Sequence, residues 1–258
     1  MNDDAWEPLR RFTQARIGLG RAGHALPTGA LLDFQLAHAR ARDAVHLPWN
    51  IEGFAAAVRA LGSKCLILET PVTDRGEYLR RPDLGRRLTE SARARLAAGT
   101  GPDIDIALIV TNGLSSTAVE AHGIPLLRAI LERYHALGLK PGPVCVVGNG
   151  RVAVSDAIGA ALKARLAVIV VGERPGLSAA DSLGIYLTYG PRPGTTDAGR
   201  NCLSNIRPPE GLDYATAAAK LAYLTVEALR RGLSGVDLKD EMVLPGQDGA
   251  VFDTLPQL

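Results

Sequence analysis

Two patterns of apolar and polar residues divide this chain, and the change between them falls near residue 62. Before it, apolar positions recur at helical spacing over residues 31–45 and again over 52–61, where Gly62 ends the pattern. Nothing strand-like appears in this stretch, and its glycine-rich segment 18–23 is either a flexible loop or a docking loop. The sequence therefore predicts a small helical N-terminal region over residues 1–62.

After residue 62, short apolar runs alternate with longer amphipathic segments. The runs have the length of buried strands and cover residues 64–70, 104–110, 144–147, 167–171 and 185–189. Helices are predicted over residues 82–96, 125–137, 155–165 and 212–231. Near-continuous apolar strands separated by helices are typical of a parallel sheet covered on both faces. Residues 63–258 are therefore predicted to form a Rossmann-like α/β domain.

Composition and charge argue against several classes of protein. The net charge of +2 over 258 residues is unlike that of a nucleic-acid surface or a polybasic membrane patch. The longest apolar run, residues 166–171, is far shorter than the roughly 20 residues that cross a bilayer. The acidic N-terminus is unlike a secretory signal, and the cysteines, Cys65, Cys145 and Cys202, form no C-x-x-C pair. We therefore expect a soluble cytoplasmic protein.

Conspicuous polar residues follow three of the predicted strands. The loops at 111–116, 148–153 and 172–176 combine glycine with Asn, Ser, Arg or Glu, and the segment 200–205 has a similar composition. In an open parallel sheet, the loops that leave the carboxyl ends of the strands form the ligand-binding edge. Glycine lets the backbone approach a ligand closely, and the polar side chains supply hydrogen-bonding groups. The sequence therefore predicts a site for a large ligand that carries many amides and hydroxyls.

One of these loops also permits a nucleotide-binding interpretation. The segment GNGRVA at 148–153, with Glu173 downstream, is similar to the G-x-G-x-x-A fingerprint of dinucleotide-binding enzymes, whose acidic residue contacts the ribose. In that fingerprint the helix begins inside the motif, whereas the first capping residues here are Ser155 and Asp156. A nucleotide-dependent (NAD-type) oxidoreductase therefore stays open as the alternative function.

The sequence contains no motif for catalysis or for metal binding. It has no G-x-S-x-G elbow and no P-loop, and its five histidines show no metal-ligand spacing. We therefore predict no catalytic residue and no metal ligand in this chain. It is expected to be a binding protein or one subunit of a larger enzyme.

Several segments, taken in order, resemble the small (light) subunit of ethanolamine ammonia-lyase. They are ARIGLGRAG at 15–23, LLDF at 31–34, RRPDLGRR at 80–87, NGLSS at 112–116, GRV at 150–152, VGERPGL at 171–177, DSLGIY at 181–186 and RNCLSNI at 200–206. The resemblance covers most of the chain, and the combination of VGERPG with NCLSNI is its most specific part.

The resemblance implies a division of labour between two chains. The family's large subunit is a TIM barrel that hosts the radical chemistry by which ethanolamine becomes acetaldehyde and ammonia. The cofactor, adenosylcobalamin, is held between the large and the small subunit. By this resemblance the present chain clamps cobalamin within a hetero-oligomer and is inactive alone. Its region 1–62 is expected to dock on the large subunit, and its domain 63–258 to contact the cofactor.

The family's cobalamin contacts on this subunit carry over to three residues, Val152, Glu173 and Cys202. A carboxylate can accept hydrogen bonds from the carboxamides of the corrin rim, and backbone groups at Val152 and Cys202 can pair with others. The chain lacks the D-x-H-x-x-G sequence that supplies a cobalt ligand in some cobalamin proteins, so none of its residues is expected to ligate the metal. The neighbours expected to position the loops or the partner subunit are Arg151, Arg174, Asn201 and Asn205.

The N-terminus bears on the expected location. Family members from ethanolamine-utilisation systems often carry a longer N-terminal extension that is linked to microcompartment targeting. Here the family-like stretch begins at residue 15, so this extension is expected to be short or absent. We expect the cytoplasm as the location, with a bacterial microcompartment as the alternative. A scaffold that supports the barrel without touching the cofactor is a third interpretation of the chain.

Overall fold

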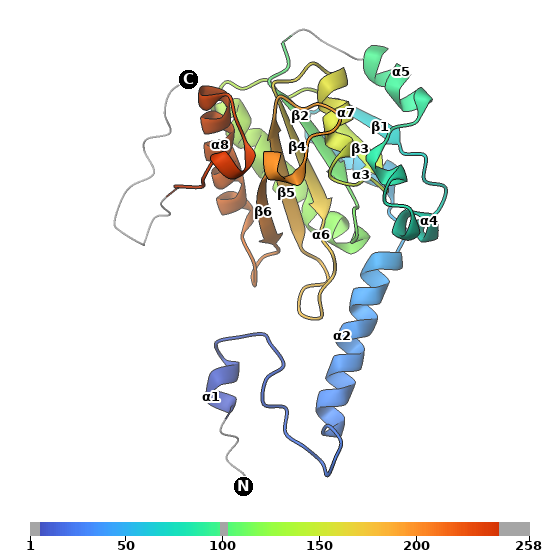
Figure 1. Cartoon of the computed structure of the whole chain (residues 1–258), viewed down its shortest axis with the longest axis vertical. Helices are drawn as coiled ribbons and strands as arrows, with labels where there is room; N and C mark the ends of the chain where they lie inside the picture. Colours follow the sequence, from blue (N-terminus) through green and yellow to red (C-terminus); the bar gives the residue numbers. More distant parts are fainter. Residues whose placement is uncertain (1–5, 99–102, 243–258) are drawn as a thin grey trace.

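A computed structural model describes residues 6–98 and 103–242 as a six-stranded sheet flanked by helices (Figure 1). The strands are β1 (Cys65–Glu69), β2 (Ile106–Thr111), β3 (Val144–Gly148), β4 (Leu166–Gly172), β5 (Leu183–Tyr189) and β6 (Asn201–Ile206). They lie in the order β1-β3-β2-β4-β5-β6. The predicted α/β class is confirmed, and each predicted strand is found close to its expected place.

The sheet is mixed rather than wholly parallel. β1, β3, β2 and β4 pair in parallel, with Ile109 opposite Ile169, whereas β5 and β6 run antiparallel to their neighbours, with Val170 opposite Ile185. The loop between β4 and β5 is too short for the crossover that parallel strands require. The expectation of a parallel sheet was therefore wrong for β5, and β6 was not predicted as a strand. The Rossmann-like description is not confirmed, because the strand order differs from 3-2-1-4-5-6.

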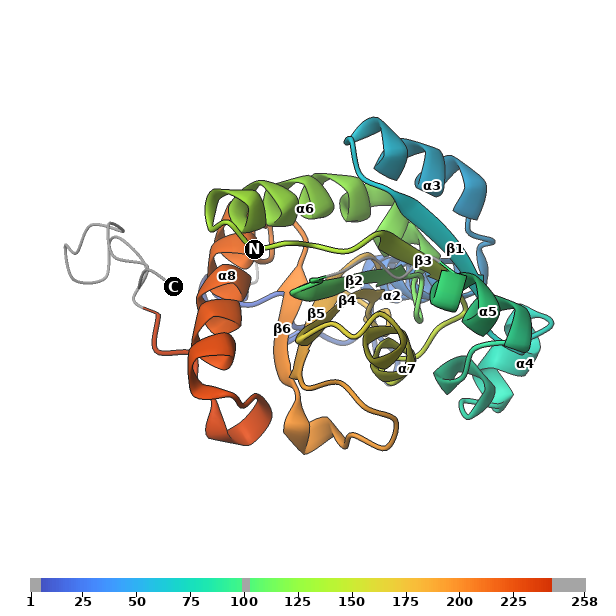
Figure 2. The same ribbon diagram turned by 90° about the horizontal axis from the view of Figure 1, so that it is seen from above.

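Helices cover both faces of the sheet (Figure 2). One face carries α3 (Ile51–Ala60), α6 (Ser116–Ala136) and α8 (Tyr214–Arg231), and the other carries α5 (Glu90–Ala98) and α7 (Val154–Ala161). Alternate strand residues face opposite layers, so Leu108 packs with the first group of helices and Ile109 with the second. Every residue of β2 is buried, which explains why the sequence reads there as an unbroken apolar run.

Helix α6 begins much earlier than the sequence predicted. The expected start was Pro125, because proline favours the first turn of a helix. The helix instead begins at Ser116, where the hydroxyl of Ser115 accepts a hydrogen bond from the Ala118 N–H at 3.1 Å. This cap satisfies one of the free N–H groups at the helix start, and Pro125 lies inside the helix.

The helix predicted over residues 82–96 forms only in its second half, as α5. Helix α4 (Arg75–Arg80) precedes it, and the 3-10 turn η1 (Leu84–Arg86) separates α4 from α5. Asp74 caps α4 through the Glu77 N–H, and the hydroxyl of Thr89 accepts from the N–H of Ala92 in α5. The first half of the predicted helix is the η1 turn and a loop, and α4 was not predicted. The remaining 3-10 turns are η2 (Asp197–Gly199) and η3 (Gly235–Asp237).

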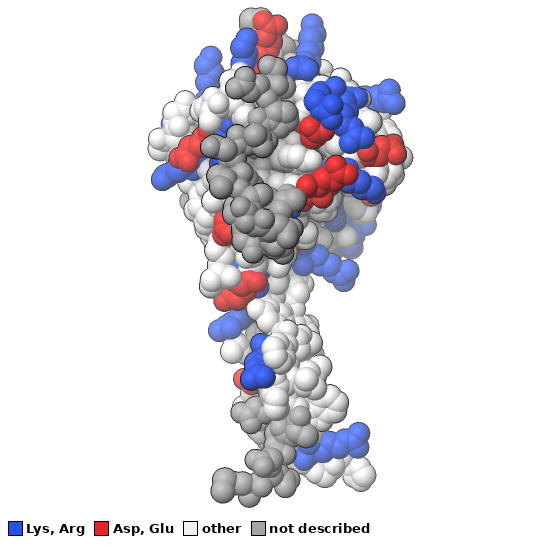
Figure 3. Space-filling view, turned by 90° about the vertical axis from the view of Figure 1, so that its left-hand side faces the viewer, with Lys and Arg blue, Asp and Glu red and all other residues white. Residues whose placement is uncertain are grey.

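The N-terminal arm, residues 6–46, stands away from the body. It contains α1 (Glu7–Arg10) and the long helix α2 (Thr28–His46), of which only Ala37 and Ala44 are buried. Figure 3 shows the arm as a stalk, and uncharged residues make up most of its described surface on the face in view. Its large exposed apolar side chains are Trp6, Leu9, Phe12, Leu26, Leu31, Leu32, Phe34 and Leu36. The arm therefore presents more apolar surface to solvent than a helix packed on a core would.

Helix α3, by contrast, packs into the main body. Phe54 and Val58 belong to the core on the α6 side of the sheet. The arm itself is joined to the body by hydrogen bonds, including Arg75 Nε to the Val45 carbonyl at 2.6 Å. The division of the chain at residue 62 into a docking region and a cofactor domain stays a prediction. None of the described helices has the length and apolar character needed to cross a membrane.

Candidate functional site

The loops that leave β2, β3 and β4 surround a pocket of about 440 Å³. It lies where the sequence predicted a ligand site, at the carboxyl ends of these parallel strands. The lining residues are Tyr78, Gly113, Leu114, Gly150, Arg151, Val152, Val171, Gly172, Glu173, Arg174, Tyr186 and Ser204. Segments far apart in the sequence therefore meet at one edge of the sheet.

Glu173 is held in place by three donors. Its carboxylate accepts hydrogen bonds from the Ser182 hydroxyl at 2.7 Å, from the Ser204 hydroxyl, and from the Asn205 N–H at 3.1 Å. Gly184 lies directly beneath, and a Cβ atom there would come within 2.9 Å of Glu173 Oε1. A carboxylate has about four acceptor positions. Glu173 therefore joins β4 to β6 and keeps one acceptor position, on Oε1, for a further donor.

Tight turns bring the loops together beneath the pocket. The Asn112 side chain accepts from the Asn149 N–H at 2.8 Å, and the Thr111 hydroxyl accepts from the Gly150 N–H at 2.9 Å. A side chain at Gly172 would collide with the carbonyls of the loop after β2. Glycine is therefore required here for close approach of the two loops.

The Arg151 side of the pocket is rigid. The Arg151 guanidinium lies 4.2 Å from the centre of the Tyr78 ring, and its Nη2 donates to the Tyr78 carbonyl at 3.1 Å. Arg75 approaches the same ring at 4.7 Å and donates to Asn149 Oδ1 at 2.9 Å. Burial raises the pKa of the Tyr78 hydroxyl, so this aromatic partner is neutral. Two guanidinium groups are thus fixed on one ring beside the pocket.

Val152 offers one backbone group to the pocket. Its carbonyl accepts from both the N–H and the hydroxyl of Ser155, at 3.1 and 2.8 Å. Its N–H has no acceptor among residues 6–98 and 103–242. Val152 can therefore donate to a ligand, while its carbonyl is already engaged within the first turn of α7.

Cys202 lies on the edge strand β6, directly opposite Tyr186 of β5. It is exposed, and the hydroxyl of Tyr186, which lines the pocket, hydrogen-bonds to its sulfur. Partial burial raises the pKa of the Cys202 thiol, and burial also raises the pKa of Tyr186 to about 12. Cys202 is therefore a neutral thiol at physiological pH, suited to a weak hydrogen bond rather than to nucleophilic attack.

The structure places two of the three predicted cofactor residues in one pocket and the third beside it. Val152 and Glu173 line the same pocket, and Cys202 is one strand away from it, beside Tyr186. Asn201 points elsewhere, because its side chain donates to the Leu238 carbonyl at 2.7 Å. The sequence analysis missed Tyr78, Tyr186 and Ser204. Tyr186 and Ser204 lie within family-like segments, whereas no local signal distinguishes Tyr78.

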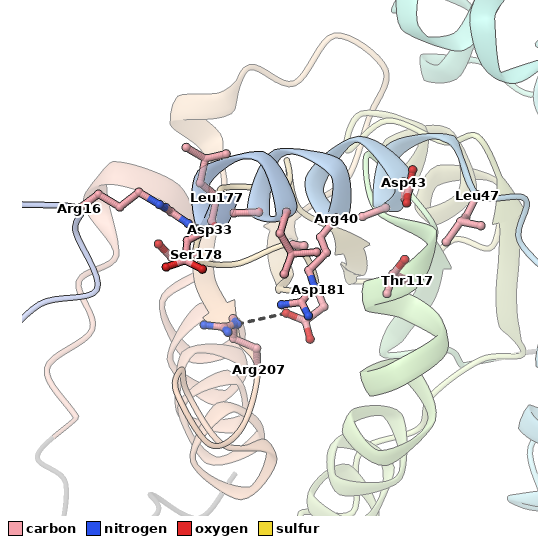
Figure 4. Close-up of a pocket in the computed structure, with 14 residues that line it drawn as sticks. Arg16, Asp33, Arg40, Asp43, Leu47, Thr117, Leu177, Ser178, Asp181 and Arg207 are labelled. Atoms are coloured by element: carbon pink, nitrogen blue, oxygen red, sulfur yellow. Dashed lines mark hydrogen bonds and ion pairs between the residues drawn. The ribbon is translucent and has the colours of Figure 1, made fainter. Parts of the chain in front are cut away.

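A second pocket, of about 650 Å³, separates α2 from the loop that follows Glu173 (Figure 4). Its lining mixes three arginines with three aspartates, and Arg207 Nε donates to Asp181 Oδ1 at 3.2 Å. No predicted cofactor residue lines it. The pocket lies between the N-terminal arm and the loop at 177–181. A hydrogen bond from the Ser178 hydroxyl to the Gln14 carbonyl, at 3.4 Å, joins these two segments.

Comparison with known proteins identifies the family. The model of the family described as ethanolamine ammonia-lyase light chain (EutC) matches residues 3–239. An ethanolamine ammonia-lyase small subunit of Azotobacter vinelandii is 54% identical over 251 residues, covering 96% of this chain and 93% of the relative. The small subunit of Pseudomonas aeruginosa is 52% identical over 250 residues, covering 96% and 91%. That of Pseudomonas fluorescens is 54% identical over 242 residues, covering 93% and 87%. This chain belongs to the ethanolamine ammonia-lyase light chain family.

Proposed function

We propose that this chain is the cobalamin-clamping small subunit of an adenosylcobalamin-dependent ethanolamine ammonia-lyase. It acts with a catalytic large subunit that converts ethanolamine to acetaldehyde and ammonia. One observation carries the proposal: Val152 and Glu173 line one pocket, beside Tyr186 and Cys202, in a chain of this family. The pocket supplies hydrogen-bonding groups and lies beside a neutral thiol, and such groups suit binding rather than chemistry.

The residues present fit the rim of a corrin ring, which carries neutral carboxamides. A carboxamide N–H can donate to the remaining position on Glu173 Oε1, and a carboxamide oxygen can accept from the Val152 N–H. Cys202 of β6 lies beside the pocket, opposite the lining residue Tyr186 of β5. Bound adenosylcobalamin would supply the radical chemistry of the reaction. The chain's own residues bind the cofactor, orient it and cover one side of it.

The large subunit would cover the rest of the cofactor. A pocket of about 440 Å³ takes only part of a molecule as large as cobalamin. The N-terminal arm would contribute to the docking of that subunit, because Phe12 and Leu32 are 74% and 57% exposed on a projecting element. Burial of such side chains against a partner stabilises an interface. The predicted docking role of residues 1–62 rests on this surface.

The nucleotide-dependent oxidoreductase has less support. A ribose-binding acid needs free acceptor positions for two hydroxyls, and three positions of Glu173 are already used. Helix α7 also begins only after the GNGRVA loop, at Val154. Binding of NADH to the chain, detected by its fluorescence, would favour this alternative.

The test is cofactor affinity in the complex of this chain with its large subunit. Glu173→Ala is expected to weaken cobalamin binding about ten- to a hundredfold, which is the effect of losing a hydrogen bond to a charged group. The matched control is Glu132→Ala, which removes an exposed carboxylate of α6. Unchanged affinity in an intact Glu173→Ala complex would contradict direct contact. Failure of a large subunit to purify with the chain would contradict the subunit role.

A further inference from the structure

The pocket carries more positive than negative charge. Its lining contains the guanidinium groups of Arg151 and Arg174 and a single carboxylate, that of Glu173. That carboxylate already accepts three hydrogen bonds, which satisfy most of its acceptor capacity. Neither arginine of the lining has a carboxylate partner among residues 6–98 and 103–242.

Both arginines have donors to spare. Nη1 of Arg151 makes no hydrogen bond in the described part of the chain, whereas Nη2 donates to the Tyr78 carbonyl and Nε is shielded by protein atoms. Arg174 is exposed on the rim, and its side chain makes no hydrogen bond or ion pair with residues 6–98 or 103–242. Arg151 is preorganised by its contact with Tyr78, whereas Arg174 is free to close on a ligand. A ligand oxygen could accept from the free donors of both guanidinium groups that reach the pocket.

The start of α7 adds to the positive potential. Its N-cap residue, Ala153, provides no side-chain cap, and the N–H groups of Val152 and Ala153 have no acceptor among the described residues. Free N–H groups at a helix start favour anions. Asp156 lies in this first turn, but Arg200 neutralises it at 2.7 Å. Two arginines and a free helix start thus belong to the lining and the edge of one pocket.

This arrangement suits a phosphate, because a guanidinium pairs with phosphate oxygens through two parallel hydrogen bonds. The carboxamides of cobalamin are neutral, and its fixed negative charge is the phosphodiester of its nucleotide arm. We propose that Arg174, with Arg151 and the N–H group of Ala153, binds this phosphodiester. The inference rests on the proposed function and gives the pocket two distinct contacts with one ligand. Glu173 accepts from the corrin rim, and Arg174 donates to the phosphate.

The experiment compares two corrinoids that differ by the phosphate alone, adenosylcobinamide and adenosylcobinamide phosphate. Their affinities for the complex of this chain and its large subunit are measured by ultrafiltration and corrin absorbance. The wild-type complex is expected to bind the phosphate form about tenfold more tightly or better. Arg174→Met should bring the ratio of the two affinities close to one and leave the affinity for adenosylcobinamide unchanged. Arg174→Lys, which keeps the charge, should retain part of the preference.

Arg192→Met is the matched control, because Arg192 is also an exposed arginine but lies outside the pocket lining. Arg151→Met should also lower the ratio of the two affinities. The melting temperature of this variant reports whether loss of the Tyr78 contact unfolds the chain.

Three outcomes would contradict the proposals. A wild-type affinity ratio of one, or equal weakening of the binding of both corrinoids by Arg174→Met, overturns the phosphate contact but not cobalamin binding. A complex that binds neither corrinoid overturns the proposed function itself. NADH binding that depends on Arg174, without corrinoid binding, would assign the phosphate to a nucleotide and also overturn the inference.

Discussion

Arg200 and Asp156 form a buried bidentate ion pair, in which the Nη1–Oδ1 and Nη2–Oδ2 distances are both 2.7 Å. Their side chains are only 1% and 2% exposed. Arg200 directly precedes β6, which carries Cys202, and Asp156 lies in α7, just after Val152. The pair therefore fixes the edge strand against the helix that opens beside the pocket. Two of the three predicted cofactor residues are positioned relative to each other by this contact.

Removal of one partner should destabilise the whole domain. Asp156→Asn leaves the Arg200 charge buried without its counter-ion, which typically costs about 3–5 kcal/mol of unfolding free energy. Urea denaturation followed by circular dichroism measures this loss. Asp197→Asn is the control, because Asp197 also approaches Arg200, at 3.7 Å, but is fully exposed. That control should lose less than about 1 kcal/mol. Equal losses in the two variants would contradict a special role for the buried pair.

Gly184 should matter for the cofactor site more than for the fold. An alanine Cβ at this position would lie 2.9 Å from Glu173 Oε1 and would push the carboxylate aside. Gly184→Ala is therefore expected to weaken cobalamin binding by the complex about tenfold. Gly29→Ala is the control, since a Cβ there meets nothing within 4 Å. If Gly184→Ala retains full affinity, the position of the Glu173 carboxylate does not determine binding.

The reactivity of Cys202 should depend on Tyr186. Burial raises the pKa of the Cys202 thiol above its ordinary value of 9.0, and the hydrogen bond from Tyr186 opposes this rise. Tyr186→Phe removes that bond, so the thiol pKa should rise further and alkylation at a given pH should slow. The measurement is the pH profile of iodoacetamide labelling, with Cys65→Ser and Cys145→Ser present in both proteins. A profile that moves to lower pH would contradict this assignment.

The cap of α8 should make stability depend on pH in acid. Asp213 accepts from the Thr216 N–H at 2.8 Å, and this bond lowers the pKa of its carboxyl below the ordinary 3.8. The contribution of the carboxylate is therefore present above that value and is lost as the pH falls through the folded-state pKa. Asp213→Ala should cost about 1 kcal/mol at neutral pH, and the difference from wild type should shrink below about pH 4. Asp33→Ala is the control, since Asp33 lies inside α2 and caps no helix. A difference that stays constant in acid would argue against the charged cap.

Much of the site followed from one rule applied to the sequence. Polar, glycine-containing loops after apolar strands predicted that the loops carrying Val152 and Glu173 would meet, and the structure has both residues in one pocket. The neighbours of Glu173 could not be predicted in the same way. Ser182 and Ser204 reach it only because β5 and β6 turn back antiparallel, and the apolar pattern of β5 does not reveal strand direction.

The sequence by itself determined the α/β class, the places of five strands, the long capped helix α8 and the family, because burial periodicity, capping residues and colinear motifs are local properties of the chain. Only the tertiary structure decided the strand order, the start of α6 at Ser116, and the placement of Tyr78 and Arg151 against each other. These features depend on contacts between segments distant in sequence. Their energies come from packing and hydrogen bonds that no local pattern records.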